Sequence, residues 1–368
     1  LLASCGGGDA PSTGSTREKP LAATTTLAVP IVAEADPMLT GLTIPADAPT
    51  RGMWSATQSW PMNGLHAVLL SNGKVLTYGT PANTPGTQDG RTYDVWTPSL
   101  GFGAGSHVTS YDAARVNSFC STAAFLGDGR LLITGGNTPR GSSLFSTATG
   151  TSTTEASQLA DDRWYATMLT LPDARAVILG GIDPYTEGMV SNPDAAITAG
   201  QVSMTPEVYS AGTGWRTLIG AQSRDAFGPD YLRASYPRAW VAPNGQVFGI
   251  SAETMWYLDV DANNGAGSVR VAGKFKTPAS STAPVNVGAT NTAVMFAPGR
   301  ILQIGGNGYF NGDGLPASNM ATVVDINAYD ALPLGISLGE SARADFVRVF
   351  VLYGMPGYPS RGVCQVPI

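Results

Sequence analysis

Charged side chains are scarce in this sequence. Asp, Glu, Lys and Arg make up 13% of its 368 residues, and the formal net charge is −6. Nucleic acids and anionic membrane surfaces are bound through clustered Lys and Arg, so neither is an expected partner. No apolar run is long enough to span a bilayer. Few charges, 45 glycines and many short apolar runs are typical of a β-rich exported protein, not a helical one. Hydrophobic residues make up 43% of the sequence, enough to build a sizeable core.

Cysteine is also scarce. The sequence contains three, which lie too far apart to form a disulfide framework: Cys5, Cys120 and Cys364. Residues 1–5, LLASC, are similar to the end of a bacterial lipoprotein signal in which Cys5 would be lipidated. An ordinary thiol in a disordered start is the alternative. We expect residues 1–50 to be a signal remnant and flexible tether, and the protein to be extracytoplasmic, either lipid-anchored to a bacterial membrane or secreted.

The sequence does contain a repeat: a turn, a basic or polar residue, two or three apolar residues and usually a glycine doublet. An apolar run precedes each copy, so each copy predicts a β-hairpin. The copies occupy 71–79, 127–136, 172–181, 243–251 and 297–306. Repeats of four short strands predict an all-β, kelch-type β-propeller over residues 51–340. A β-sandwich is disfavoured, because it should not repeat one hairpin five times.

Cys120 occupies a fixed place in this repeat. Nine positions before the turn residue of each copy lie Gly64, Cys120, Tyr165, Tyr236 and Thr290. These positions should be equivalent, near the start of the same strand in successive blades. If that strand is the innermost one, Cys120 and Tyr165 meet at a mouth of the central channel although 45 residues separate them. The alternative is a buried cysteine and a core aromatic without chemistry.

A thiol beside a phenol can undergo a specific oxidation. Copper and oxygen can join the sulfur to the ring carbon ortho to the hydroxyl, which gives a thioether. The substituted ring is then easier to oxidise to a radical, and its phenolate suits Cu(II).

Two segments carry a resemblance to a known family. Residues 117–137, NSFCSTAAFLGDGRLLITGGN, followed by 161–181, DDRWYATMLTLPDARAVILGG, resemble the copper radical oxidases, the galactose oxidase and glyoxal oxidase family. Residues 234–248 resemble a later blade of the glyoxal oxidase branch, and the similarity extends over about residues 51–328. It implies that Tyr165 is a copper ligand and radical carrier cross-linked to Cys120. Trp164 would shield the radical or simply pack.

The resemblance also implies an activity: two-electron oxidation of a small aldehyde or primary alcohol, with O2 reduced to H2O2 by copper and the Tyr–Cys radical cofactor. We expect a monomer that contacts a membrane only through its lipid. A non-catalytic kelch propeller that binds a glycan or a protein is the alternative. A sialidase-type hydrolase is disfavoured, because the sequence shows no Asp-box repeats.

The sequence departs from the family in its histidines. The family site uses an axial tyrosine followed directly by histidine, and a second histidine from a β-sandwich domain after the propeller. Here the two histidines, His66 and His107, both precede Cys120, and no Tyr-His pair occurs. His66 is expected on a strand, His107 in a loop, and neither as a ligand. One phenolate holds copper poorly, so we expect this chain to be inactive as it stands.

The last part of the sequence also departs from the repeat. Residues 344–368 contain no sixth turn and glycine doublet. We expect residues 341–368 to be an aberrant or truncated tail. The five recognisable repeats would then belong to a propeller of seven blades, with the C-terminal sandwich domain absent. A propeller of five blades is the competing interpretation.

Overall fold

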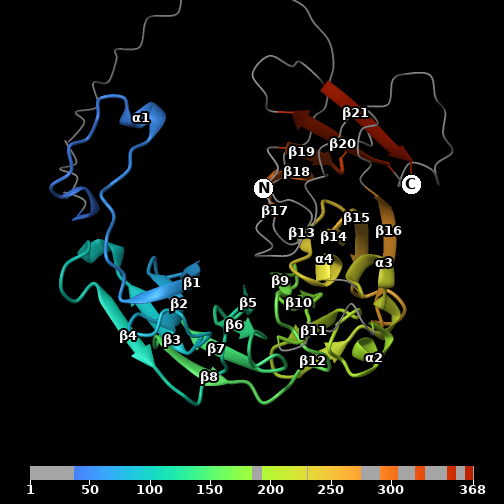
Figure 1. Ribbon diagram of the computed structural model, residues 1–368, viewed down its shortest axis with the longest axis horizontal. Helices are drawn as coiled ribbons and strands as arrows, with labels where there is room; N and C mark the ends of the chain where they lie inside the picture. Colours follow the sequence, from blue (N-terminus) through green and yellow to red (C-terminus); the bar gives the residue numbers. More distant parts are fainter. Residues whose placement is uncertain are drawn as a thin grey trace, which may run out of the picture.

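The computed structural model describes residues 37–184, 193–229, 231–274, 291–305, 320–327, 346–353 and 361–367. Its strands form five antiparallel sheets that follow one another along an open arc (Figure 1). Four sheets have four strands and the fifth has five, and strands adjacent in sequence pair within each sheet. This confirms the prediction of an all-β propeller arrangement with five repeats.

The strands have the following bounds. The first sheet contains β1 (Met62–Leu69), β2 (Val75–Pro81), β3 (Thr92–Trp96) and β4 (His107–Tyr111). The second contains β5 (Thr122–Phe125), β6 (Leu131–Thr134), β7 (Ser142–Ser146) and β8 (Thr151–Thr154). The third contains β9 (Thr167–Thr170), β10 (Ala176–Leu179), β11 (Glu207–Ser210) and β12 (Gly214–Thr217). The fourth contains β13 (Arg238–Val241), β14 (Val247–Ser251), β15 (Thr254–Asp259) and β16 (Ser268–Lys274).

The fifth sheet contains β17 (Asn291–Ala297), β18 (Arg300–Gly305), β19 (Met320–Asp325), β20 (Phe346–Tyr353) and β21 (Arg361–Pro367). The described helices are short: α1 (Ala48–Arg51), α2 (Pro193–Thr198), α3 (Arg224–Phe227) and α4 (Tyr231–Ala234), with 3-10 turns η1 (Pro37–Leu39), η2 (Pro98–Leu100) and η4 (Ile219–Ala221). Among the residues described, no helix is long and apolar enough to cross a membrane.

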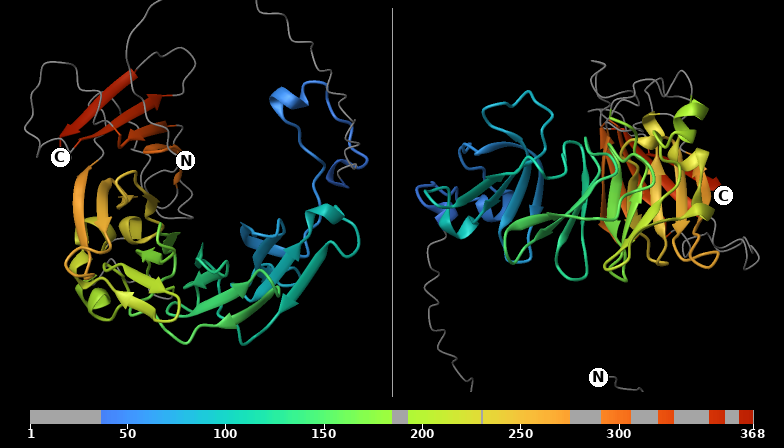
Figure 2. Two further views of the ribbon diagram at one scale, coloured as in Figure 1. Left: turned by 180° about the vertical axis from the view of Figure 1, so that it is seen from behind. Right: turned by 90° about the horizontal axis from the view of Figure 1, so that it is seen from below.

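The first strand of each sheet lies on the inside of the arc, and the later strands lie progressively further out (Figures 1 and 2). The inner strands β1, β5, β9 and β13 are those that precede the repeated turn. The second strands β6 and β10 belong to sheets that have a neighbour on each side, so both of their faces are covered. All four residues of β6 and of β10 are buried, which explains why these segments read LLIT and AVIL instead of alternating.

The repeated turns need a left-handed residue. Gly73, Gly129, Gly245 and Gly299 take φ between +67° and +84° at this position, and Ala174 takes φ +70° without being glycine. A left-handed conformation costs an L-residue about 1–2 kcal/mol. This cost exceeds the free energy that glycine loses, relative to alanine, because its unfolded chain has more conformational freedom.

Ala174→Gly is therefore expected to stabilise the protein by about 1 kcal/mol, because residue 174 is exposed and only its backbone is strained. Urea denaturation measures the change. Ala176→Gly is the matched control, since Ala176 is buried in β10 with ordinary strand geometry, and it should destabilise. A lower midpoint for Ala174→Gly would contradict the strain argument.

The glycine doublets allow one blade to touch the next. A Cβ on Gly135 would lie 2.1 Å from the carbonyl oxygen of Arg163, and one on Gly180 would lie 2.4 Å from that of Ala234. Arg163 and Ala234 each stand two residues before a tyrosine that precedes an inner strand. The doublet is thus the point where a blade supports the entrance to the inner strand of its neighbour.

The domain boundaries at residues 50 and 340 stay predictions, as does the count of seven blades. Strands β20 and β21 pair with each other, and β20 pairs with β19, so both are part of the fifth sheet. Cys5 and Thr290 lie outside the described residues.

Candidate active site at the entrance to the inner strands

Three residues occupy one structural position in successive sheets. Cys120, Tyr165 and Tyr236 each lie two residues before the inner strand of their sheet, which begins at residues 122, 167 and 238. All three adopt left-handed backbone conformations, with φ of 61°, 58° and 48°. For bulky residues this conformation is rare, and it concentrates at functional sites where the surrounding structure enforces it.

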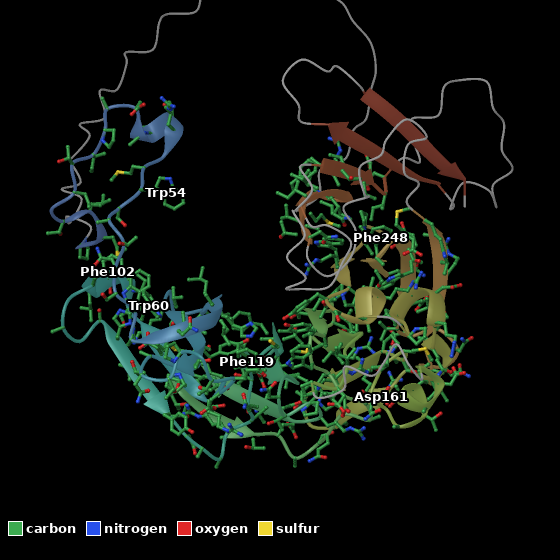
Figure 3. The ribbon with its side chains drawn as sticks, in the orientation of Figure 1. Trp54, Trp60, Phe102, Phe119, Asp161 and Phe248 are labelled. Atoms are coloured by element: carbon green, nitrogen blue, oxygen red, sulfur yellow. The ribbon has the colours of Figure 1, made fainter. Side chains whose placement is uncertain are left out.

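Backbone hydrogen bonds connect the three positions across the sheets. The amide of Tyr165 donates to the carbonyl oxygen of Cys120 (3.1 Å), and the amide of Tyr236 donates to the carbonyl oxygen of Tyr165 (2.7 Å). Phe119, next to Cys120, lies on the inner side of the arc (Figure 3). The second, third and fourth sheets are therefore joined where their inner strands begin.

The side chains converge as well. The phenols of Tyr165 and Tyr236 lie near the Cys120 thiol, and both favour its thiolate form and lower its pKa. Burial acts more strongly in the other direction and raises the pKa of Cys120 to about 11. The thiol is thus protonated at neutral pH, which disfavours a role as a hydrolytic nucleophile.

Two aromatic rings stack on Tyr165, whose side chain is buried. Trp164 lies 3.5 Å away between ring centroids with an interplanar angle of 18°, and Tyr236 lies 4.6 Å away at 30°. This arrangement protects the Tyr165 ring from solvent. Whether Trp164 shields a radical stays a prediction, since the same contact serves ordinary packing.

Arg163 anchors the chain just before this aromatic pair. Its guanidinium is fully buried and donates to the carbonyl oxygens of Gly180 (2.6 Å) and Thr205 (2.8 Å) and to Oε1 of Glu207 (2.8 Å). The ion pair spans 44 residues of sequence and ties β11 to the entrance of β9. Arg163 is therefore a structural support for Tyr165.

The two histidines lie in the first sheet. His66, on β1, stacks on Tyr78 with centroids 4.6 Å apart, and burial lowers its pKa to about 4. It shares a cavity of about 400 Å³ with Tyr236. Nδ1 of His107 lies 2.7 Å from Oδ2 of Asp94. His107 begins β4, so the prediction of a loop is wrong. Apolar and polar residues alternate too weakly in this segment for the sequence to indicate a strand.

The side chains described above supply only part of what a copper radical site needs. Cys120 and Tyr165 lie near each other, as the cross-linked part would need. A complete Cu(II) site needs further nitrogen or oxygen ligands. Within the described part of the chain, no three His, Cys, Asp or Glu side chains are grouped to hold a metal ion. The thiol and phenol are thus of the chemical types that the organic part of such a cofactor needs, whereas the described residues group no full set of copper ligands.

Tyr236 is the member of this cluster that the sequence did not single out. It appeared among the equivalent repeat positions, and that periodicity was the available signal. Its stacking on Tyr165 and its contact with Cys120 depend on the arrangement of three sheets.

The segment that contains Cys120 and Tyr165 is similar to known proteins. A family model described as the glyoxal oxidase N-terminus matches residues 73–207, the segment that contains both Cys120 and Tyr165. The chain is thus similar to galactose and glyoxal oxidases over part of its length. Two curated galactose oxidase sequences from Gibberella zeae are each 26% identical to it over 275 residues. The match covers 71% of this chain and 37% of each galactose oxidase, so the chain corresponds to little more than a third of these relatives.

The fold of this chain is also found among solved structures. One is described as a novel fungal alcohol oxidase with catalytic diversity among the AA5 family, in complex with copper. It superposes with a TM-score of 0.55 at 18% identity, over 85% of this chain and 55% of the fungal protein. This match shows a shared fold.

Proposed function

We propose that this chain carries the tyrosine–cysteine site of a copper radical oxidase, which oxidises a small aldehyde or primary alcohol by two electrons and reduces O2 to H2O2. The observation that supports this most directly is the proximity of Cys120 and Tyr165, which neighbouring sheets join by a backbone hydrogen bond and whose side chains influence each other. Similarity to galactose oxidases in sequence and to an alcohol oxidase in fold supports it further.

Each residue has a proposed role. Sγ of Cys120 forms a bond to a ring carbon of Tyr165 ortho to its hydroxyl, while the S–H and that C–H bond break. The two protons and two electrons pass to O2, which becomes H2O2. Tyr165 would then be a copper ligand and one-electron carrier, and Trp164 would cover its ring. Copper, when bound, supplies the second one-electron couple that a two-electron oxidation requires.

We expect the 368-residue chain alone to lack turnover. Its two histidines lie on β1 and β4 of the first sheet, where His66 stacks on Tyr78 and His107 pairs with Asp94. Peroxide release with a panel of small aldehydes and primary alcohols measures this. Turnover by the chain alone would overturn the expectation.

The proposed location is outside the cytoplasm. The low charge and the LLASC start support export, with Cys5 as the lipidated residue. Mass analysis of the N-terminal peptide from bacterial membranes tests the lipid directly, and a free Cys5 thiol would contradict it.

Peptide mapping tests the proposed function. After incubation with Cu(II) and air, the peptides with Cys120 and Tyr165 should be joined and lighter by two hydrogens. The same protein kept under nitrogen with a chelator is the control. Two free side chains in the copper-loaded, aerated protein would reject the proposal.

A second candidate is a non-catalytic kelch propeller that binds a glycan. A pocket in the first sheet, described below, favours it. Such binding needs no copper, so it should be unaffected by Tyr165→Phe.

A further inference from the structure

A second cavity lies at one end of the first sheet, where β1 and β3 begin and β2 and β4 end. Its volume is about 690 Å³, and residues from all four strand ends line it. This volume suits a mono- or disaccharide. Neither Cys120 nor Tyr165 is among the residues that line this cavity.

Tyr111, the last residue of β4, presents a fixed aromatic ring to this cavity. Its side chain is 55% exposed, so solvent reaches the ring. Its hydroxyl donates to Oδ2 of Asp89 (3.1 Å), while Oδ1 of Asp89 accepts from Arg91 (3.0 Å). An exposed ring with a fixed orientation binds a partner at low entropic cost.

Apart from Tyr111 and Asp89, the lining consists of neutral polar groups, prolines and Ala82. Asn83 and Thr84 are exposed beside the ring. Thr92 is 4% exposed, and its Oγ1 has no hydrogen-bond partner among the residues that the structure describes. Among the described residues that line the cavity there is no Lys or Arg, and the carboxylate of Asp89 disfavours an anion. Hydroxyl and amide groups around an aromatic ring match the alternating C–H faces and hydroxyls of a sugar.

The pocket lies close to the thiol–phenol pair. Gly90, next to Asp89, donates its amide to Oδ1 of Asn117 (2.7 Å), and the amide of Ser118 donates to Gly90 (3.4 Å). Cys120 follows two residues later. The inner strand β1 begins at this end of its sheet, just as β5 begins beside Cys120. A molecule in the pocket would therefore lie at the same face of the propeller as the pair.

We propose that the cavity beside Tyr111 binds a neutral saccharide, which stacks on the Tyr111 ring and hydrogen-bonds to Asn83, Thr84 and Thr92. This site goes beyond the proposed oxidation, because it needs neither copper nor the cross-link. It would hold a glycan on the face that carries Cys120 and Tyr165.

Isothermal titration calorimetry of the full chain tests the site, with cellotetraose and mannotetraose as neutral probes and tetragalacturonate as the anionic control. We expect at least one neutral probe to bind and tetragalacturonate not to bind. Tyr111→Ala should weaken binding about tenfold or more, because it removes the stacking surface. Tyr111→Phe should retain most of the affinity, because it keeps the ring.

Trp54→Ala is the matched control. Trp54 is 98% exposed on the segment before the first sheet, and it does not line the cavity (Figure 3). Its loss should leave the affinity unchanged, as should Tyr165→Phe. Failure of both neutral probes to bind, equal binding of tetragalacturonate, or unchanged affinity in Tyr111→Ala overturns the proposal. None of these results depends on whether the Cys120–Tyr165 link forms, so the two proposals fail separately.

Discussion

Tyr165→Phe is expected to abolish the loss of two hydrogens that copper and air produce in the unsubstituted chain. The coupling needs the phenol, because removal of an electron and the hydroxyl proton activates the ring carbon that the sulfur attacks. Phenylalanine keeps the stacking on Trp164 and Tyr236 but cannot be oxidised in this way. Mass mapping and thiol counting, in a background with Cys5→Ser and Cys364→Ser, measure the outcome.

Tyr236→Phe is the matched control for this experiment. It removes the second phenol that contacts Cys120 while keeping its ring on Tyr165. The link should still form, because the oxidised phenol is that of Tyr165. A link that persists in Tyr165→Phe and joins Cys120 to Tyr236 would contradict the assignment of Tyr165.

Arg163→Met is expected to lower the free energy of unfolding by about 3–5 kcal/mol, because it leaves the carboxylate of Glu207 buried without its partner. The side chains of Arg163 and Glu207 are 0% and 2% exposed. The change also removes the hydrogen bonds to Gly180 and Thr205. Urea denaturation followed by tryptophan fluorescence measures the loss.

Two variants separate burial from charge. Arg140→Met breaks an ion pair with Asp162 in which the Arg140 side chain is 41% exposed, so it should cost about 1 kcal/mol or less. The double variant Arg163→Met/Glu207→Leu should recover part of the stability, because no charge is left buried. If Arg163→Met and Arg140→Met lowered the free energy of unfolding equally, burial of the ion pair would not be what determines its contribution to stability.

The sequence predicts the fold well because one hairpin turn recurs in each blade. Once the turn residues of the copies are aligned, Cys120, Tyr165 and Tyr236 fall at one position, and the structure places all three two residues before an inner strand. Local chemistry was enough for this, since the turn requires a left-handed residue and the buried second strands require apolar runs.

Other features depend on contacts between distant parts of the chain. The ion pair of Arg163 with Glu207 and the stacking of Tyr236 on Tyr165 join residues 44 and 71 positions apart, so no local pattern shows them. The left-handed backbone at Tyr165 was equally hidden, because tyrosine gives no signal for it. The segment GAGSHVTS predicts a loop at His107, whereas pairing with β3 makes it the start of β4.

The main-chain hydrogen bonds from Tyr165 to Cys120 and from Tyr236 to Tyr165 have a consequence for protein engineering. They fix the spacing of the three side chains through atoms that every amino acid except proline supplies. The outer strands and their connecting turns lie on the opposite side of each blade, so they can be exchanged or lengthened while the spacing between sulfur and ring is maintained.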